Sequence, residues 1–243
     1  MNASSRAVVV LPTYNERGHI TEVIDRLIAA VGPEVDVMVV DDGSPDRTAD
    51  AVRAHPAYDR ITLLERPSKL GLASAYLDAF GRALDADYAA IVQIDADLSH
   101  DPADVPRLLE ALDDADLVIG SRYVPGGRIE NWSNLRRALS RAGNLYARAW
   151  CGWALRDATS GLRAFKAGAI RAAEFAGVTS EGYAFQIEMA YRVARAGGVV
   201  REIPITFVER HKGKSKLSRG IVLEALVRVP GWGLRYRFTR GAG

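Results

Sequence analysis

Short apolar runs alternate with amphipathic stretches through the first half of the chain, and this alternation constrains the fold more than any other feature. The apolar runs, which we predict to be strands, lie at 7–11, 36–40, 61–65, 88–94 and 117–120. Helical patterns fill the intervals between them, at 19–31, 46–54, 72–84 and 103–112. Ser44 and Pro45 are typical of the cap and first position of a helix, so the second helix is expected to start there. Strands that alternate with helices form βαβ units, and we predict an α/β fold with a mostly parallel central sheet.

The second half of the chain is less regular. We expect helices at 134–150 and 185–196, a strand at 199–207 and an amphipathic helix from about Ser218. Loops are expected at 124–131, 157–161 and 208–216. Because no repeat, low-complexity tract or linker interrupts the sequence, we predict a single domain over residues 1–243.

The composition suits one globular domain, with 243 residues, 48% of them hydrophobic and 26% charged. No window approaches the roughly 20 apolar residues that a membrane-spanning helix needs, and the first residues form no apolar signal region, so a cytoplasmic protein is expected. Cys151 is the only cysteine, which excludes an internal disulfide and agrees with a reducing compartment. The four histidines are scattered, which gives a zinc site little support.

The charges are strongly segregated along the chain. Residues 1–120 hold 10 Lys and Arg against 22 Asp and Glu, whereas residues 121–243 hold 22 against 8. An acidic half suits a divalent cation, and a basic half suits an anionic ligand, an anionic membrane or nucleic acid. Solvated charges that serve solubility are the alternative, but they explain the segregation poorly.

Polar residues follow the predicted strands, at the edge where an open α/β sheet binds its ligands. Asp95 and Asp97 come directly after the apolar run that ends at Ile94, with one residue between them. Paired carboxylates repel each other unless a cation or a proton intervenes, and Mg²⁺ prefers carboxylates together with substrate phosphate oxygens. The pair therefore predicts a site for a metal ion and a diphosphate.

Several motifs, taken in order along the chain, resemble the inverting family 2 glycosyltransferases. They are Pro12-Thr13-Tyr14-Asn15-Glu16, Asp41-Asp42-Gly43-Ser44-Pro45-Asp46, Gly71-Leu72, Asp95-Ala96-Asp97-Leu98-Ser99-His100 and Gly120-Ser121-Arg122-Tyr123. Two later motifs resemble the dolichyl- and polyprenyl-phosphate mannose synthases in particular: Gly182-Tyr183-Ala184-Phe185-Gln186, and Arg210 followed by Gly213-Lys214-Ser215-Lys216. The resemblance implies a Rossmann-like, A-type glycosyltransferase fold. It further implies a nucleotide-sugar and metal-binding half at 1–122, and an acceptor-binding, membrane-facing half at 123–243.

The resemblance also assigns residues to the donor site. It implies that the nucleotide sugar is bound by Pro12, Tyr14, Glu16, Val40, Asp42, Asp95, Ala96, Asp97, Arg122, Arg210 and Lys216. Asp95 and Asp97 serve Mg²⁺ or Mn²⁺. Some relatives place a Gln two positions after the second Asp as a further ligand, and this chain has Ser99 there. A hydroxyl or a water is then expected to complete the metal site.

The catalytic residues implied by the resemblance are Asp97, Arg122, Arg210 and Lys216. Arg122 follows the fifth predicted strand, where its charge could meet a phosphate or the sugar, or could pair with a buried acid. Arg210 and Lys216 belong to a basic loop that the resemblance makes a mobile clamp over the donor and acceptor phosphates. A surface loop that is basic for solubility is the alternative.

The acceptor side is less determined by the sequence. The segment from Asp157 to Arg163 resembles the family's acceptor-side segment, although Leu162 stands where Phe is common. Arg163 is expected either to contact an anion or to form a structural salt bridge. Glu181 and Glu188 are the carboxylates that could act as a base, and Glu188, inside a helical pattern, is expected to be structural.

Two segments mix arginine with aromatic and aliphatic residues, a composition that suits the headgroup layer of a bilayer. They are 134–153 and the segment from about 221 to 240. Ordinary core helices give similar apolar spacing. A polyprenyl substrate cannot easily leave the bilayer, so we expect a peripheral protein at the cytoplasmic face of the membrane, and a membrane-protein partner is left open.

The function implied is transfer of mannose from GDP-mannose to a polyprenyl (dolichyl-type) phosphate, with inversion, to give polyprenyl phosphate mannose for lipid-linked glycosylation. The alternative within this class is a polyprenyl-phosphate glucosyltransferase that uses a UDP-sugar. A nucleic-acid-binding module would leave the acidic strand-end motifs unexplained, so no nucleic-acid partner is expected. A catalytically inactive nucleotide-sugar sensor would be expected to lack Asp97, Arg210 or Lys216, all of which are present.

Overall fold

A seven-stranded sheet forms the centre of the protein in the computed structural model, which describes residues 6–209 and 219–240. The strand order is β3-β2-β1-β4-β7-β5-β8. The strands are β1 (Ala7–Thr13), β2 (Val35–Asp41), β3 (Ile61–Glu65), β4 (Ala90–Gln93), β5 (Leu117–Ser121), β7 (Arg163–Lys166) and β8 (Val200–Pro204). All neighbouring pairs are parallel except those made by β7, which runs antiparallel to β4 and β5. The predicted α/β fold with a mostly parallel sheet is confirmed.

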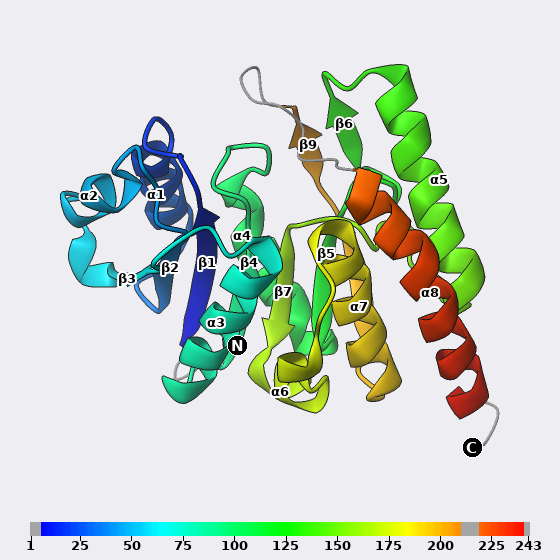
Figure 1. The fold of residues 1–243 in the computed structure, drawn as a ribbon. Helices are drawn as coiled ribbons and strands as arrows, with labels where there is room; N and C mark the ends of the chain where they lie inside the picture. The colour runs from blue at the N-terminus through cyan, green and yellow to red at the C-terminus, as the bar shows by residue number, and fades with distance from the viewer. Residues whose placement is uncertain (1–5, 210–218, 241–243) are drawn as a thin grey trace.

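Helices cover both faces of the sheet (Figure 1). They are α1 (Ile20–Ala30), α2 (Thr48–Arg53), α3 (Leu72–Asp85), α4 (Val105–Ala111), α5 (Asn134–Cys151), α6 (Ala167–Ala172), α7 (Gly182–Arg195) and α8 (Arg219–Arg240). β1 shows why two layers are needed, because alternate side chains of a strand point to opposite faces. Val8 and Val10 join the core cluster of α3 and α7, whereas Val9 and Leu11 join the cluster of α1 and α4.

The second helix begins later than the sequence predicts. Ser44 does not cap it, because the Ser44 hydroxyl donates to Asp41 Oδ1 at 2.6 Å. Instead Asp46 Oδ1 accepts hydrogen bonds from the backbone N–H and the hydroxyl of Thr48, at 3.0 and 2.6 Å, and α2 starts at Thr48. Local side-chain bonds to a strand-end aspartate thus outweigh the cap signal in the sequence.

The second half of the chain departs further from the prediction. The loop expected at 124–131 contains β6 (Arg128–Glu130), which pairs in parallel with β9 (Thr206–Val208) as a separate two-stranded sheet. The strand expected at 199–207 is therefore two strands, β8 in the central sheet and β9 outside it. Strand β7 and helix α6 were not predicted at all. Strands from both halves of the sequence share the central sheet, since β7 and β8 come from beyond residue 122.

α5 and α8 lie side by side at one edge of the molecule (Figure 1). The Tyr146 hydroxyl on α5 donates to the Leu226 carbonyl on α8 at 2.8 Å. A Cβ atom at Gly233 would lie 2.3 Å from the Trp150 carbonyl oxygen, so only glycine permits this approach. Apolar side chains of α8 point both inward, as at Val229, and outward, as at Val227, so the predicted amphipathic division is not seen over its described side chains.

This close approach generates a stability prediction. Gly233→Ala should lower the free energy of unfolding by about 1–3 kcal/mol, the usual cost of inserting an atom into a packed contact, as measured by urea unfolding. Gly231→Ala is the matched control, because a Cβ at Gly231 meets nothing within 4 Å. In a helix that exchange is neutral or stabilising by up to about 1 kcal/mol. Equal effects of the two substitutions would contradict the packing argument.

Candidate active site

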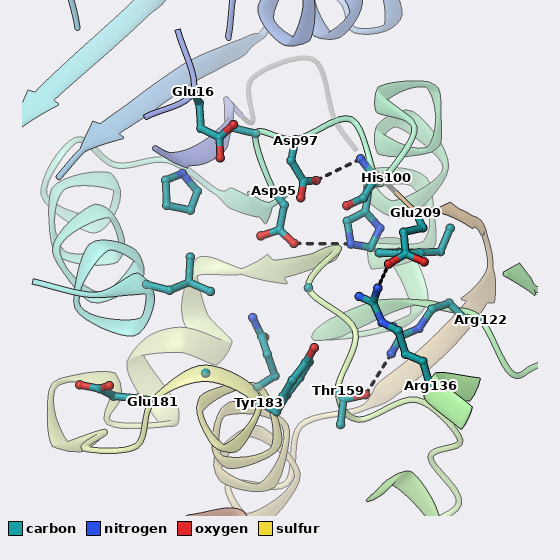
Figure 2. Close-up of a pocket in the computed structure, with 18 of the residues that line it drawn as sticks. Glu16, Asp95, Asp97, His100, Arg122, Arg136, Thr159, Glu181, Tyr183 and Glu209 are labelled. Atoms are coloured by element: carbon teal, nitrogen blue, oxygen red, sulfur yellow. Dashed lines mark hydrogen bonds and ion pairs between the residues drawn. The ribbon is translucent and has the colours of Figure 1, made fainter. Parts of the chain in front are cut away.

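A cavity of about 410 Å³ lies beyond the carboxyl ends of β1 and β4. Its lining comes from both halves of the sequence, from Pro12 on β1 to Glu209 beyond β9. Figure 2 shows Glu16, Asp95 and Asp97 on one side of this cavity, across from Glu181 and Tyr183. The predicted donor residues that line it are Pro12, Glu16, Asp95, Ala96, Asp97, Ser99 and Arg122.

The two aspartates stand in a tight turn after β4. Leu98 adopts a positive φ of 59°, and the Ser99 backbone N–H donates to Asp97 Oδ1 at 3.0 Å. The Ser99 carbonyl in turn accepts from the Val208 N–H at 3.0 Å, which fastens the turn to β9. Ser99 is buried. The chain reverses direction here after β4, and both Asp95 and Asp97 lie on the cavity wall.

His100 lies buried against the acid pair; it belongs to the motif that begins at Asp95, but no role was predicted for it. Its Nε2 is 3.9 Å from Asp95 Oδ2, and its ring packs edge-on against Phe207 with 5.0 Å between centroids. Burial lowers the pKa of His100 from 6.5 to about 4. The imidazole is therefore neutral near pH 7 and does not compete with a cation for the aspartates.

The acid pair fits a divalent cation. Carboxylates are hard oxygen ligands of the kind that Mg²⁺ and Mn²⁺ take. The space in front of Asp95 is kept open by Gly161, where a Cβ would lie 3.2 Å from Asp95 Oδ2. In the described ranges, 6–209 and 219–240, no group of three or more His, Cys, Asp or Glu side chains could hold a metal ion.

Three of the predicted nucleotide residues do not line the cavity. Val40 is buried in the core within β2. Asp42 Oδ1 lies 2.6 Å from Arg66 Nε, and Asp42 Oδ2 accepts from the Gly71 N–H at 3.1 Å. Tyr14 lies under the ammonium of Lys69, 4.1 Å from Nζ to the ring centroid, and it is Lys69 that reaches the cavity.

Arg122 is held by a buried ion pair. Its Nε and Nη2 donate to the two carboxylate oxygens of Asp157 at 2.8 and 2.7 Å, and its backbone N–H donates to Asp157 Oδ2 at 2.9 Å. Nη2 also donates to the Thr159 hydroxyl at 3.0 Å, and Thr159 accepts from Asn144 Nδ2 at 3.0 Å as well. Of the two sequence expectations for Arg122, the buried acid partner is present, and the guanidinium also lines the cavity.

The two partners stabilise each other's charge. Burial opposes the charge of Arg122, but the attraction and hydrogen bonds of Asp157 outweigh it, so the pKa of Arg122 is raised. Burial likewise favours the neutral acid at Asp157, yet Arg122 outweighs it and the pKa of Asp157 is lowered. Both groups stay charged across the neutral range.

Arg163 forms its hydrogen bonds with backbone carbonyls, and within residues 6–209 and 219–240 it makes no ion pair. It is completely buried, and its guanidinium donates to the backbone carbonyls of Ala158, Ser160 and Gln186 at 2.6, 2.8 and 2.6 Å. Burial lowers the pKa of Arg163 from 12.5 to about 9. The residue fastens the loop at 157–161 to α7, and the expected salt bridge is not present among the described residues. The expected anion contact stays a prediction.

The two carboxylates considered as bases differ in position. Glu181 is exposed at the start of α7 and lines the cavity. Glu188 is buried, accepts from the Ser180 hydroxyl, and pairs with Arg192 Nε at 2.8 Å. The structural role expected for Glu188 is confirmed.

Some cavity residues could not be selected from the sequence. Arg136 belongs to α5, whose arginines were interpreted only as membrane-facing, yet it lines the cavity, pairs with Glu209 and lies 4.2 Å from the centroid of the Trp132 ring. Tyr183 lines the same wall, inside a motif already noted. Arg210 and Lys216 lie outside the described residues, so their predicted roles remain predictions.

Comparison with known proteins decides the family. The family model for "Glycosyl transferase family 2" matches residues 8–172. The chain belongs to glycosyl transferase family 2. The predicted glycosyltransferase class and A-type fold are thereby confirmed.

This glycosyltransferase is 48% identical to the undecaprenyl-phosphate mannosyltransferase of Micrococcus luteus, over 96% of each chain. It is 42% identical to the polyprenol monophosphomannose synthase of Mycolicibacterium smegmatis, over 99% of this chain and 91% of that protein. Among solved structures, glucosyl-3-phosphoglycerate synthase of Mycobacterium tuberculosis with Mn²⁺, uridine diphosphate and glucosyl-3-phosphoglycerate has a TM-score of 0.70 at 21% identity, covering 94% of this chain and 81% of that one. At that identity the structural likeness shows the fold.

The Arg122–Asp157 pair generates a prediction for this glycosyltransferase. Asp157→Asn leaves the Arg122 charge buried without its partner, which should cost about 3–5 kcal/mol of unfolding free energy near pH 7. The folded pKa of Asp157 is lowered. Its contribution is therefore present above the unfolded pKa of about 3.9 and is lost as the pH falls through the folded value.

Urea unfolding of wild type and variant at neutral and acid pH provides the measurement. The stability gap between them should narrow below about pH 4. Asp59→Asn, at an exposed position, is the control and should show no such gap. A gap that does not change with pH would contradict the assignment to the Asp157 charge.

Proposed function

We propose that this glycosyltransferase transfers mannose from GDP-mannose to the phosphate of a polyprenyl lipid, with inversion at the anomeric carbon. The proposal rests on sequence similarity, over nearly the full length, to two relatives. One is named an undecaprenyl-phosphate mannosyltransferase and the other a polyprenol monophosphomannose synthase. The cavity supports it, because an acidic side for a metal-bound diphosphate faces a side that carries arginine. We further propose that residues 1–122 bind the donor and residues 123–243 the acceptor, within one domain.

The donor end of the cavity is built around the acid pair. Asp95 and Asp97 would hold Mg²⁺ or Mn²⁺, and the bound ion would neutralise charge that builds up on the leaving nucleoside diphosphate. Pro12, Glu16 and Ala96 line the same part of the cavity and would position the nucleotide. Glu16 is held in place by its own backbone, whose N–H donates to the Thr48 hydroxyl at 3.1 Å.

The proposed acceptor end carries two arginines, Arg122 and Arg136, each of which also pairs with a carboxylate. Figure 2 shows Arg122 and Arg136 on the same side of the cavity, beside Thr159. Arginine binds phosphate oxygens through fixed, directional donors, so these two side chains suit an acceptor phosphate. Arg210 and Lys216, from the loop outside the described residues, are proposed to close over both phosphates.

The proposed reaction is a single displacement. An unprotonated oxygen of the acceptor phosphate attacks the anomeric carbon of mannose while the bond from that carbon to the diphosphate oxygen breaks. GDP leaves with the electron pair, and polyprenyl phosphate mannose forms with the opposite anomeric configuration. No proton has to be removed during attack, because a phosphate monoester with a second pKa of about 6 is already largely ionised near neutral pH.

The bilayer is proposed as the source of the acceptor. No helix among the described residues is long and apolar enough to cross a membrane. We propose peripheral attachment at the cytoplasmic face through α5 and α8, which lie at the same edge of the molecule and carry exposed leucines.

The donor is tested directly with the full-length protein and a polyprenyl phosphate, supplied in turn with radiolabelled GDP-mannose and UDP-glucose. Transfer from GDP-mannose with little transfer from UDP-glucose is expected. The reverse preference would establish the glucosyltransferase alternative, and NMR of the product anomer tests inversion.

The acid pair generates a second prediction. Asp97→Asn keeps the shape of the side chain but removes its charge, so it should abolish turnover and metal-dependent binding of GDP-mannose while the fold stays intact. Calorimetry of donor binding with and without Mn²⁺ provides the measurement. Asp101→Asn, a few residues further along the chain and outside the cavity lining, is the matched control and should bind the donor normally. Unchanged metal-dependent binding in a folded Asp97→Asn protein would refute the metal role.

The absence of a side-chain base generates a third prediction. Glu181→Gln should keep turnover within about tenfold of wild type, because proton removal contributes about 10²–10⁴-fold only where a base acts. Turnover of both proteins should fall as the pH drops through about 6, with ionisation of the acceptor phosphate. Rate profiles against pH at saturating donor provide the measurement. A loss of three orders of magnitude with normal substrate binding would show that Glu181 is a base.

A further inference from the structure

A second cavity, of about 440 Å³, lies on the far side of Arg122 from the donor site. Its wall comes from α5, from the segment after β5 and from the loop before Asp157. It shares with the first cavity only Arg122, whose guanidinium is bound by Asp157 and Thr159. The ion pair thus separates the two spaces.

The second cavity is strongly basic. Besides Arg122 it is lined by Arg141, Arg148 and Arg156, and none of the described residues that line it is Asp or Glu. Within the described part of the chain, these three guanidinium groups form no ion pair with a carboxylate. Like charges gathered in one hollow repel each other, so the arrangement favours a bound anion.

Tyr123 lies among these arginines. It lines the cavity, but its hydroxyl is buried and does not reach into the open space. Arg141 lies 5.8 Å from the Tyr123 ring centroid. Arg156 is held at the rim because its backbone N–H donates to Glu202 Oε2 at 2.8 Å. The planar guanidinium groups of the arginines suit the oxygens of a phosphate group, which they bind through paired N–H donors.

The surroundings indicate where such a phosphate comes from. Arg141, Leu145 and Arg148 lie one turn apart on α5, so they share one face of the helix. Leu145 is 66% exposed, and the same helix exposes Leu135 at 71% and Leu139 at 59%. A helix that presents leucines to the acyl boundary and arginines to the phosphates lies in the surface of a bilayer. A second copy of the chain is a poorer occupant, because a symmetric contact would bring the same arginines together.

We propose that the cavity lined by Arg141, Arg148, Arg156 and Tyr123 binds the phosphate headgroup of an anionic phospholipid, separately from the donor and acceptor phosphates. The site anchors α5 to anionic membrane. It sets the enzyme's preference for anionic lipids, whereas the exposed leucines insert into the membrane whatever the charge of its lipids.

The test is co-sedimentation of the full chain with phosphatidylcholine vesicles that contain or lack phosphatidylglycerol. The Arg141→Gln/Arg148→Gln double variant should lose about fivefold in partitioning for each arginine, or about 25-fold in all, on the anionic vesicles only. Binding to neutral vesicles should be unchanged.

Arg82→Gln/Arg195→Gln is the matched control, because it removes the same charge from exposed positions that line neither cavity. It should reduce anionic binding far less. Equal losses of anionic vesicle binding in the two double variants would overturn the proposal, because net charge alone would then explain the effect. Unchanged binding of the first variant would overturn it as well. Circular dichroism verifies that both variants are folded.

Two further outcomes would overturn the proposal by assigning the cavity a different ligand or partner. Loss of inorganic phosphate binding by calorimetry, with vesicle binding intact, would make it a site for a soluble anion. Loss of self-association in sedimentation velocity would make the face a contact between copies. The vesicle assay contains neither donor nor acceptor, so its result stands apart from the proposed mannosyl transfer.

Discussion

The pair formed by Arg122 and Asp157 joins parts of the molecule that are far apart in sequence. Arg122 follows β5, Asp157 begins the loop that leads to β7, and Asn144 of α5 bonds to both Asp157 and Thr159. Two buried charges are costly unless each satisfies the other, and here three hydrogen bonds link them. Through Asn144 the pair also contacts α5, the helix that contributes side chains to both cavities.

Charge segregation in the sequence acquires a spatial meaning in the fold. The acidic half supplies Glu16, Asp95 and Asp97 to one side of the donor cavity, and the basic half supplies Arg136 to the other. The halves are not separate bodies, because β7 and β8 are strands of the same sheet as β1 to β5. The fold thus brings acidic side chains from the first half and an arginine from the second half to opposite sides of one cavity at the edge of the sheet.

The sequence predicted the first five strands well and the second half poorly, for identifiable reasons. Buried parallel strands are continuous apolar runs, as in β1 and β2, and such runs are visible without a structure. β7 is four residues long and contains Arg163, whose burial is compensated by hydrogen bonds to three backbone carbonyls, two in the preceding loop and one in α7. In the site, Asp95 and Asp97 could be predicted because they follow a strand directly. Arg136 could not, since its approach to the cavity depends on how α5 packs, and the pairing of Asp42 with Arg66 depends on a contact between separate loops.

The antiparallel strand β7 determines how far apart the carboxyl ends of β4 and β5 lie. Neighbouring strands are about 4.8 Å apart, so the ends of β4 and β5 would be about that distance apart if they were adjacent. With β7 between them, the separation doubles to about 10 Å. That spacing separates the end of β4, which leads to Asp95, from the end of β5, which leads to Arg122. An antiparallel strand also begins where its neighbours end, so Gly161 enters at the same edge without a side chain. In this fold β7 serves as a spacer one strand wide between the strand ends that lead to Asp95 and to Arg122.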